Sequence, residues 1–133
     1  MKIPDNVKTY ELISSTLWFG EDGILYSIPK RSFSPNLSLD EIKAEVEKLK
    51  TIKGSDKVCM IAESDSFVPP PNKIQRDYIS KSMPDIVKAL AIVTTSPVAK
   101  VISNLFFGLK PPSYPAKVFS NEKDAKEWIK QYQ

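Results

Sequence analysis

The sequence predicts a single α/β domain, spanning residues 1–133, in which helices pack on a mixed, largely parallel sheet. Three observations predict this fold class. Short apolar runs, typical of buried strands, alternate with longer segments whose apolar residues recur at helical spacing. Capping residues, glycines and prolines separate these segments. The first two strands are joined by a short turn, so the expected order is β-β-α-β-α-β-α-β-α.

The chain begins with a predicted hairpin. Residues 12–19 and 24–28 are strand-like, and Glu21-Asp22-Gly23 supplies the turn because glycine adopts positive φ at no steric cost. Residues 31–37 form a loop. A helix follows from Ser38, whose hydroxyl forms a capping box with Glu41. Its apolar face consists of Ile42, Val46 and Leu49.

The middle of the chain alternates strands and helices. Gly54 ends the first helix, and residues 57–62 form a strand that is apolar on both faces, as buried parallel strands are. Asn72 caps a second helix, which Pro84 interrupts, and residues 89–94 form the next strand. The apolar residues of the second helix are Ile74, Tyr78 and Ile79.

The last third contains the most regular helical pattern. Ser96 and Pro97 suit the start of a helix, and Gly108 suits its end. The apolar stripe of this helix consists of Val98, Val101, Ile102, Leu105 and Phe106. Residues 116–119 form the final strand. Ser120 or Asn121 caps the last helix, whose apolar face carries Ala125, Trp128, Ile129 and Tyr132.

Composition limits the classes of function. The chain is 41% hydrophobic and 26% charged, as globular domains are. No apolar run approaches the roughly 20 residues of a membrane span, the first ten residues lack the features of a secretory signal, and one cysteine cannot form an internal disulfide. These features predict a cytoplasmic protein. The net charge is +3, and 17 of the 19 basic residues are lysines spread among acids, which predicts no nucleic-acid partner.

The sequence offers little catalytic chemistry. It contains no histidine, which removes the commonest general base and zinc ligand. Cys59 lies inside an apolar strand and has no histidine to activate it. The four glycines are isolated, and no acids have metal-ligand spacing. We therefore expect no enzyme activity, no cofactor and no metal.

Two polar segments between a strand and a helix start are candidate sites. Thr94, Thr95 and Ser96 present hydroxyls next to free backbone N–H groups, which could hold an anion or another ligand; ordinary capping is the alternative. The second segment is Glu63–Asn72, "ESDSFVPPPN". It could be a phosphorylation site, a ligand loop or a stiff connection, and its three prolines favour the stiff connection.

A third candidate is an apolar surface near the end of the third helix. Phe107 lies off the apolar stripe of that helix, so it either packs under the following proline loop or contributes to a contact patch. Such a patch could bind a protein, a second copy in a homodimer or, less favoured, the periphery of a membrane. Its residues are Phe107, Leu109, Pro111, Pro112 and Tyr114.

The order of elements and the C-terminal residues resemble a known family. Pro115-x-Lys117-x-Phe119, followed by Ala125 and Trp128, is similar to a pattern in small bacterial proteins with the SpoIIAA-like (STAS) fold, the fold of anti-sigma-factor antagonists. The resemblance covers about residues 10–132. In the antagonists, a partner kinase phosphorylates a serine after the third strand. The resemblance therefore implies Ser66, in Asp65-Ser66, as a candidate phosphorylation site, although Phe67 and Val68 stand where the family has a hydroxyl residue and a glycine.

From these observations we expect a non-enzymatic module that binds and regulates a partner protein. The alternative is a small-molecule or lipid-binding module that uses the same fold, since some STAS-like domains bind such ligands.

Overall fold

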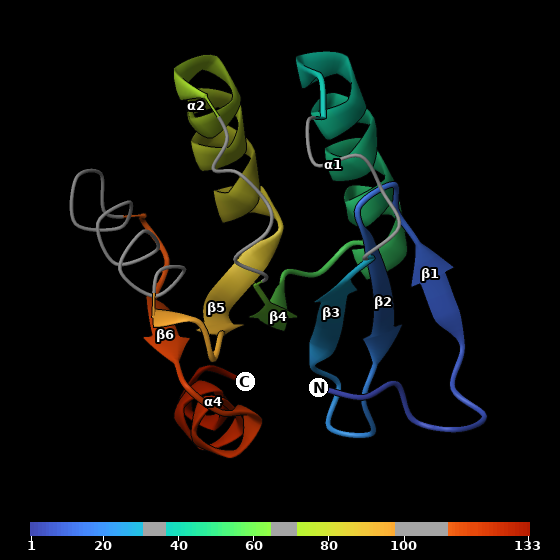
Figure 1. Ribbon diagram of the computed structural model, residues 1–133, viewed down its shortest axis with the longest axis vertical. Coiled ribbons are helices and arrows are strands. Elements are labelled where there is room, and N and C mark those ends of the chain that lie inside the picture. Colours follow the sequence, from blue (N-terminus) through green and yellow to red (C-terminus); the bar gives the residue numbers. More distant parts are fainter. Residues whose placement is uncertain (31–36, 65–71, 98–111) are drawn as a thin grey trace.

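The computed structural model describes residues 1–30, 37–64, 72–97 and 112–133 (Figure 1). Its centre is a six-stranded sheet in which the strands lie side by side in chain order. The first two neighbouring pairs are antiparallel and the other three are parallel, which confirms the mixed, largely parallel sheet. The strands are β1 (Thr9–Glu11), β2 (Ser15–Phe19), β3 (Leu25–Pro29), β4 (Val58–Glu63), β5 (Val87–Val93) and β6 (Ala116–Phe119).

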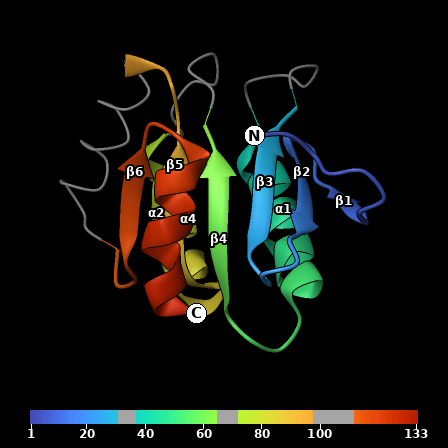
Figure 2. The same cartoon turned by 90° about the horizontal axis from the view of Figure 1, so that it is seen from below.

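Helices cover both faces of the sheet. Figures 1 and 2 show α1 (Leu39–Lys53) and α2 (Lys73–Ser82) on one face and α4 (Glu122–Ile129) on the opposite face. Single 3-10 turns follow α2 and α4, at Met83–Asp85 and Lys130–Tyr132. The predicted helix at residues 98–106 lies outside the described residues.

Local signals in the sequence account for the turns and caps. In the β2–β3 hairpin, Gly23 has a φ of 80°, as expected for a glycine turn. Ser38 and Glu41 form the predicted capping box of α1. Asn72 caps α2 as predicted, and Asn121 is the cap of α4 because its side chain accepts from the backbone N–H of Asp124 at 2.8 Å.

The start of the sheet differs from the prediction. The expected strand over residues 12–19 is too long, because the chain turns at Leu12–Ser14 and the strand β2 begins only at Ser15. The backbone N–H of Leu12 donates to the Ser15 carbonyl at 2.9 Å, which closes the turn. The unpredicted strand β1 precedes the turn and pairs with β2. The fold therefore begins with three strands rather than two.

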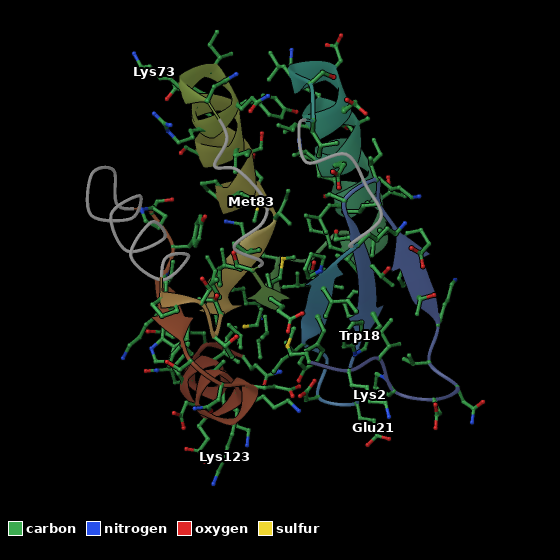
Figure 3. All side chains as sticks on the ribbon, viewed as in Figure 1. Lys2, Trp18, Glu21, Lys73, Met83 and Lys123 are labelled. Atoms are coloured by element: carbon green, nitrogen blue, oxygen red, sulfur yellow. The ribbon has the colours of Figure 1, made fainter. Side chains whose placement is uncertain are left out.

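The core consists of two apolar layers on opposite faces of the sheet. Neighbouring residues of a strand point to opposite faces, so Ile61 of β4 packs under α4 and Met60 packs under α1 and α2. Residues of the N-terminal segment, Met1, Ile3 and Val7, complete the layer on the α4 side. The side chains fill both layers, while Lys73 and Lys123 extend outwards from their helices (Figure 3).

None of the described helices is both long and apolar enough to cross a membrane.

Candidate functional site

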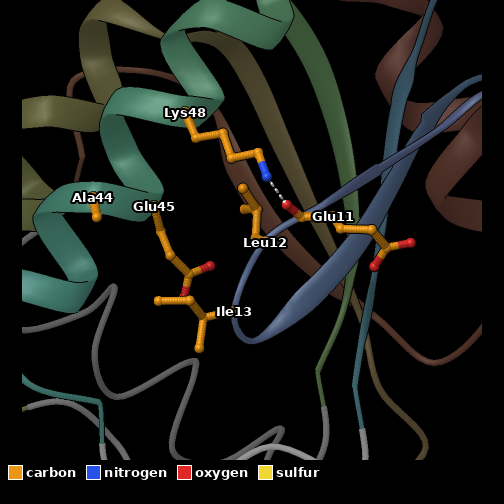
Figure 4. A pocket seen from close by; sticks show the side chains of 6 residues that line it. All are labelled: Glu11, Leu12, Ile13, Ala44, Glu45 and Lys48. Carbon is orange, nitrogen blue, oxygen red and sulfur yellow. Dashed lines mark hydrogen bonds between the residues drawn. The ribbon is translucent and has the colours of Figure 1, made fainter.

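A groove lies between the β1–β2 turn and helix α1. Its volume is about 300 Å³, and Figure 4 shows its lining from close by. Two short segments build it: the turn supplies one wall, and the α1 face that flanks the buried Val46 supplies the other. The lining residues are Glu11, Leu12, Ile13, Ala44, Glu45 and Lys48.

Hydrogen bonds between the turn and α1 hold the two walls together. The Ser14 hydroxyl lies 2.7 and 2.9 Å from the two carboxylate oxygens of Glu45. The Lys48 ammonium donates to the backbone oxygen of Glu11, as Figure 4 shows. Leu12 is buried, but 43% of Ile13 is exposed. Hydrogen bonds to α1 therefore hold the chain before and after Ile13, at Glu11 and at Ser14, while Ile13 itself faces solvent.

The two carboxylates of the groove have opposite electrostatic environments. The Lys30 ammonium bonds Glu11 Oε2 at 2.7 Å and lowers the pKa of that carboxyl below its ordinary value. Burial raises the pKa of Glu45, although the Ser14 hydroxyl and the more distant Lys30 oppose the shift. Glu45 is therefore a half-buried carboxylate whose ionised form is poorly compensated.

This difference predicts a pH-dependent effect of Glu45→Gln. The folded state holds a proton on Glu45 more readily than the unfolded state, whose carboxyl titrates near 4.5. The free energy of unfolding of the wild type should therefore fall relative to that of Glu45→Gln as pH rises through the window above 4.5. Urea unfolding of both proteins at several pH values between about 4 and 7 measures this difference. A difference that stays constant, or changes in the opposite direction, would contradict the prediction.

Cys59 does not offer a reactive thiolate. Its side chain is buried on β4, and burial raises the pKa of the thiol despite the opposing charge of Lys88. In the described part of the chain, no three histidine, cysteine, aspartate or glutamate residues are grouped so that they could hold a metal ion.

The structure places the predicted hydroxyl turn at the carboxyl end of β5. Thr94 is buried, and its hydroxyl oxygen accepts from the backbone N–H of Ser96 at 3.2 Å. Thr95 is exposed. This hydrogen bond from a backbone N–H to a hydroxyl two residues earlier is typical of a local turn. Anion binding by these three residues stays a prediction.

Part of the predicted contact patch is described. Pro112 and Tyr114 are half-buried, and Tyr114 packs against the core layer under α1 and α2. Burial raises the pKa of the Tyr114 phenol. The remaining members, Phe107, Leu109 and Pro111, lie outside the described residues, as does Ser66. The patch and the phosphorylation site therefore stay predictions.

The groove itself was not predicted from the sequence. Its central contact joins Ser14 to Glu45, 31 residues apart, and no local pattern reports such a pair. One signal was present: Glu45 immediately precedes the buried Val46 and lies three residues after Ile42, so it had to flank the apolar face of α1.

Comparison with known proteins places the chain in a family. The model of a domain of unknown function, DUF7793, matches residues 17–133. The chain belongs to this family. The α1 wall of the groove lies inside the DUF7793 match, whereas the β1–β2 turn precedes it.

A solved structure among those similar to this DUF7793 protein has low sequence identity to it. It is the crystal structure of a protein with unknown function from Arthrobacter sp. FB24, with 23% sequence identity and a TM-score of 0.30. The similarity covers 85% of this chain and 90% of that chain. No curated protein matches this DUF7793 chain.

Proposed function

We propose that this DUF7793 protein is a non-enzymatic, STAS-like cytoplasmic module that regulates a partner protein by docking to it. The observation that carries the proposal is the groove, where an exposed isoleucine lies between charged side chains on a turn fastened to α1. An exposed aliphatic residue bordered by polar groups is typical of a protein contact. The protonated thiol of Cys59 and the lack of any histidine support a binding function over a catalytic one.

The STAS-like relationship is supported by the alternation of strands and helices from β3 to β5 and by the helix α4 that follows β6. Within this proposal, phosphorylation of Ser66 by a partner kinase would be the regulatory step. A phosphate adds nearly two negative charges, which can abolish docking.

A paired substitution tests the docking function. Ile13 and Ile74 are the large apolar residues exposed in the described part of the chain, at 43% and 66%, and only Ile13 borders the groove. The full chain, tagged and expressed in its own host, should recover a partner that Ile13→Asp loses and that Ile74→Asp retains. Failure to recover a specific partner, together with a monomeric sedimentation coefficient, would overturn the proposal.

The second candidate function is binding of a small molecule or lipid. The volume of the groove, about 300 Å³, favours it because that is near the lower limit of ligand pockets. Native mass spectrometry of protein purified from its own host should then show a bound small molecule or lipid. A spectrum of the chain without added mass, and no binding to liposomes, would exclude this candidate.

A further inference from the structure

Glu45 is a carboxylate without a cationic partner among the described residues. The Ser14 hydroxyl shares its one proton between the two Glu45 oxygens, and none of the ion pairs among the described residues includes Glu45. An ionised carboxylate has about four acceptor positions, so it can accept further bonds from a ligand. The ionised form of a half-buried carboxylate is stabilised when a cation binds beside it.

Two cations near Glu45 in the described part of the chain, Lys30 and Lys48, are already bound elsewhere. The Lys30 ammonium bonds Glu11 Oε2 and the Leu12 carbonyl, each at 2.7 Å. The Lys48 ammonium bonds the Glu11 carbonyl, so it points across the groove to the strand and not along α1. Glu41, another charged residue of α1, is also acidic and opposes ionisation of Glu45. Compensation of Glu45 by these groups is therefore incomplete.

The walls of the groove fit an aliphatic chain. Leu12, Ile13 and Ala44 line it next to the carboxylate, and Ile13 remains exposed. Lysine and arginine side chains place their methylene groups on apolar surfaces while the charged head reaches a polar partner. The apolar wall could contact the methylene groups of such a side chain, and the adjacent Glu45 carboxylate could bind its charged head.

We propose that the groove receives a lysine or arginine side chain of the partner protein, with its cation on Glu45 and its methylene groups on Ile13. This inference rests on the docking function proposed above and specifies the chemistry that the partner presents. Arginine is the better fit, because its guanidinium can bond both oxygens of a carboxylate.

A titration with a side-chain mimic tests the site directly. The probe is n-butylguanidinium chloride, followed by the backbone amide signals of the ¹⁵N-labelled full chain. We expect saturable shifts at Ile13 and Glu45, and binding at least about tenfold weaker in Glu45→Gln, since a charge-assisted bond is lost. Glu47→Gln is the matched control, because Glu47 lies two residues along α1, is exposed and does not line the groove.

Two results would overturn the inference. One is equal binding of n-butanol, which has the same alkyl chain without the charge. The other is unchanged binding of the guanidinium to Glu45→Gln. If Glu45→Gln disturbed folding, Ile13→Ser would serve as a second variant that leaves the carboxylate in place. We expect it to weaken guanidinium binding severalfold. Unchanged affinity of this variant would also count against binding in the groove.

The partner experiment separates this inference from the docking function. A partner lost with Ile13→Asp but retained with Glu45→Gln would overturn the basic-residue inference and leave the docking function intact. If the guanidinium binds in a way that depends on Glu45, but no partner is recovered and the protein sediments as a monomer, the docking function is overturned. The inference that a partner supplies the cation is then overturned with it. The cation site would then belong to a free amine or guanidine.

Discussion

Replacing Ile61 with alanine is expected to lower the free energy of unfolding by about 3 kcal/mol. Ile61 lies on β4, whose neighbours β3 and β5 are both parallel to it, and its side chain is fully buried in the layer under α4. The loss combines the transfer free energy of the deleted methyl and methylene groups with the cavity that remains. The rigid neighbours on both sides limit how far the site can collapse.

Urea unfolding followed by tryptophan fluorescence measures this effect. Trp18 is buried in the same layer as Ile61, so its fluorescence reports the unfolding of that layer. Ile61→Val is the matched control, because it deletes one methylene group and should cost about 1 kcal/mol. A loss below about 1 kcal/mol for Ile61→Ala would mean that the layer under α4 is loosely packed. The groove is on the opposite face, so guanidinium binding to the folded Ile61→Ala protein should be unchanged.

Features governed by neighbours in the sequence were predictable. The β2–β3 turn, the capping box at Ser38 and the cap Asn72 each depend on residues within four positions of one another. The buried, parallel environment of β4 followed from its continuous apolar run. Each of these signals has a local physical cause that the sequence displays directly.

Features that depend on distant residues were not predictable in this way. The apolar pair Leu12-Ile13 looks like the start of a strand, yet Leu12 is buried and Ile13 exposed because the chain turns there to meet α1. The Ser14–Glu45 contact depends both on where β2 begins along the chain and on which side of α1 faces the sheet. The periodicity of apolar residues predicts each helix or strand separately, but it does not predict which residues of two elements contact each other.

Gly20 is another residue whose role depends on packing, and Gly20→Ala is expected to cost about 2 kcal/mol. A Cβ atom at Gly20 would lie 2.6 Å from Asp22 Oδ1 and 2.7 Å from Tyr26 Cε2. Neither neighbour moves freely. Asp22 accepts bonds from the Ile24 N–H at 3.0 Å and the Tyr26 hydroxyl at 2.8 Å, and the buried Tyr26 ring stacks on Trp18 with centroids 5.5 Å apart.

Gly23→Ala in the same turn separates crowding from backbone strain. A Cβ atom there would meet nothing within 4 Å, but the φ of 80° is unfavourable for alanine and should cost about 1 kcal/mol. Only Gly20→Ala should also change the near-ultraviolet circular dichroism of the Trp18–Tyr26 stack, because only it displaces Tyr26. Two outcomes would contradict this explanation: a larger loss of stability in Gly23→Ala than in Gly20→Ala, or an unchanged near-ultraviolet spectrum of Gly20→Ala. In either case crowding by Asp22 and Tyr26 would not be the reason for glycine at position 20.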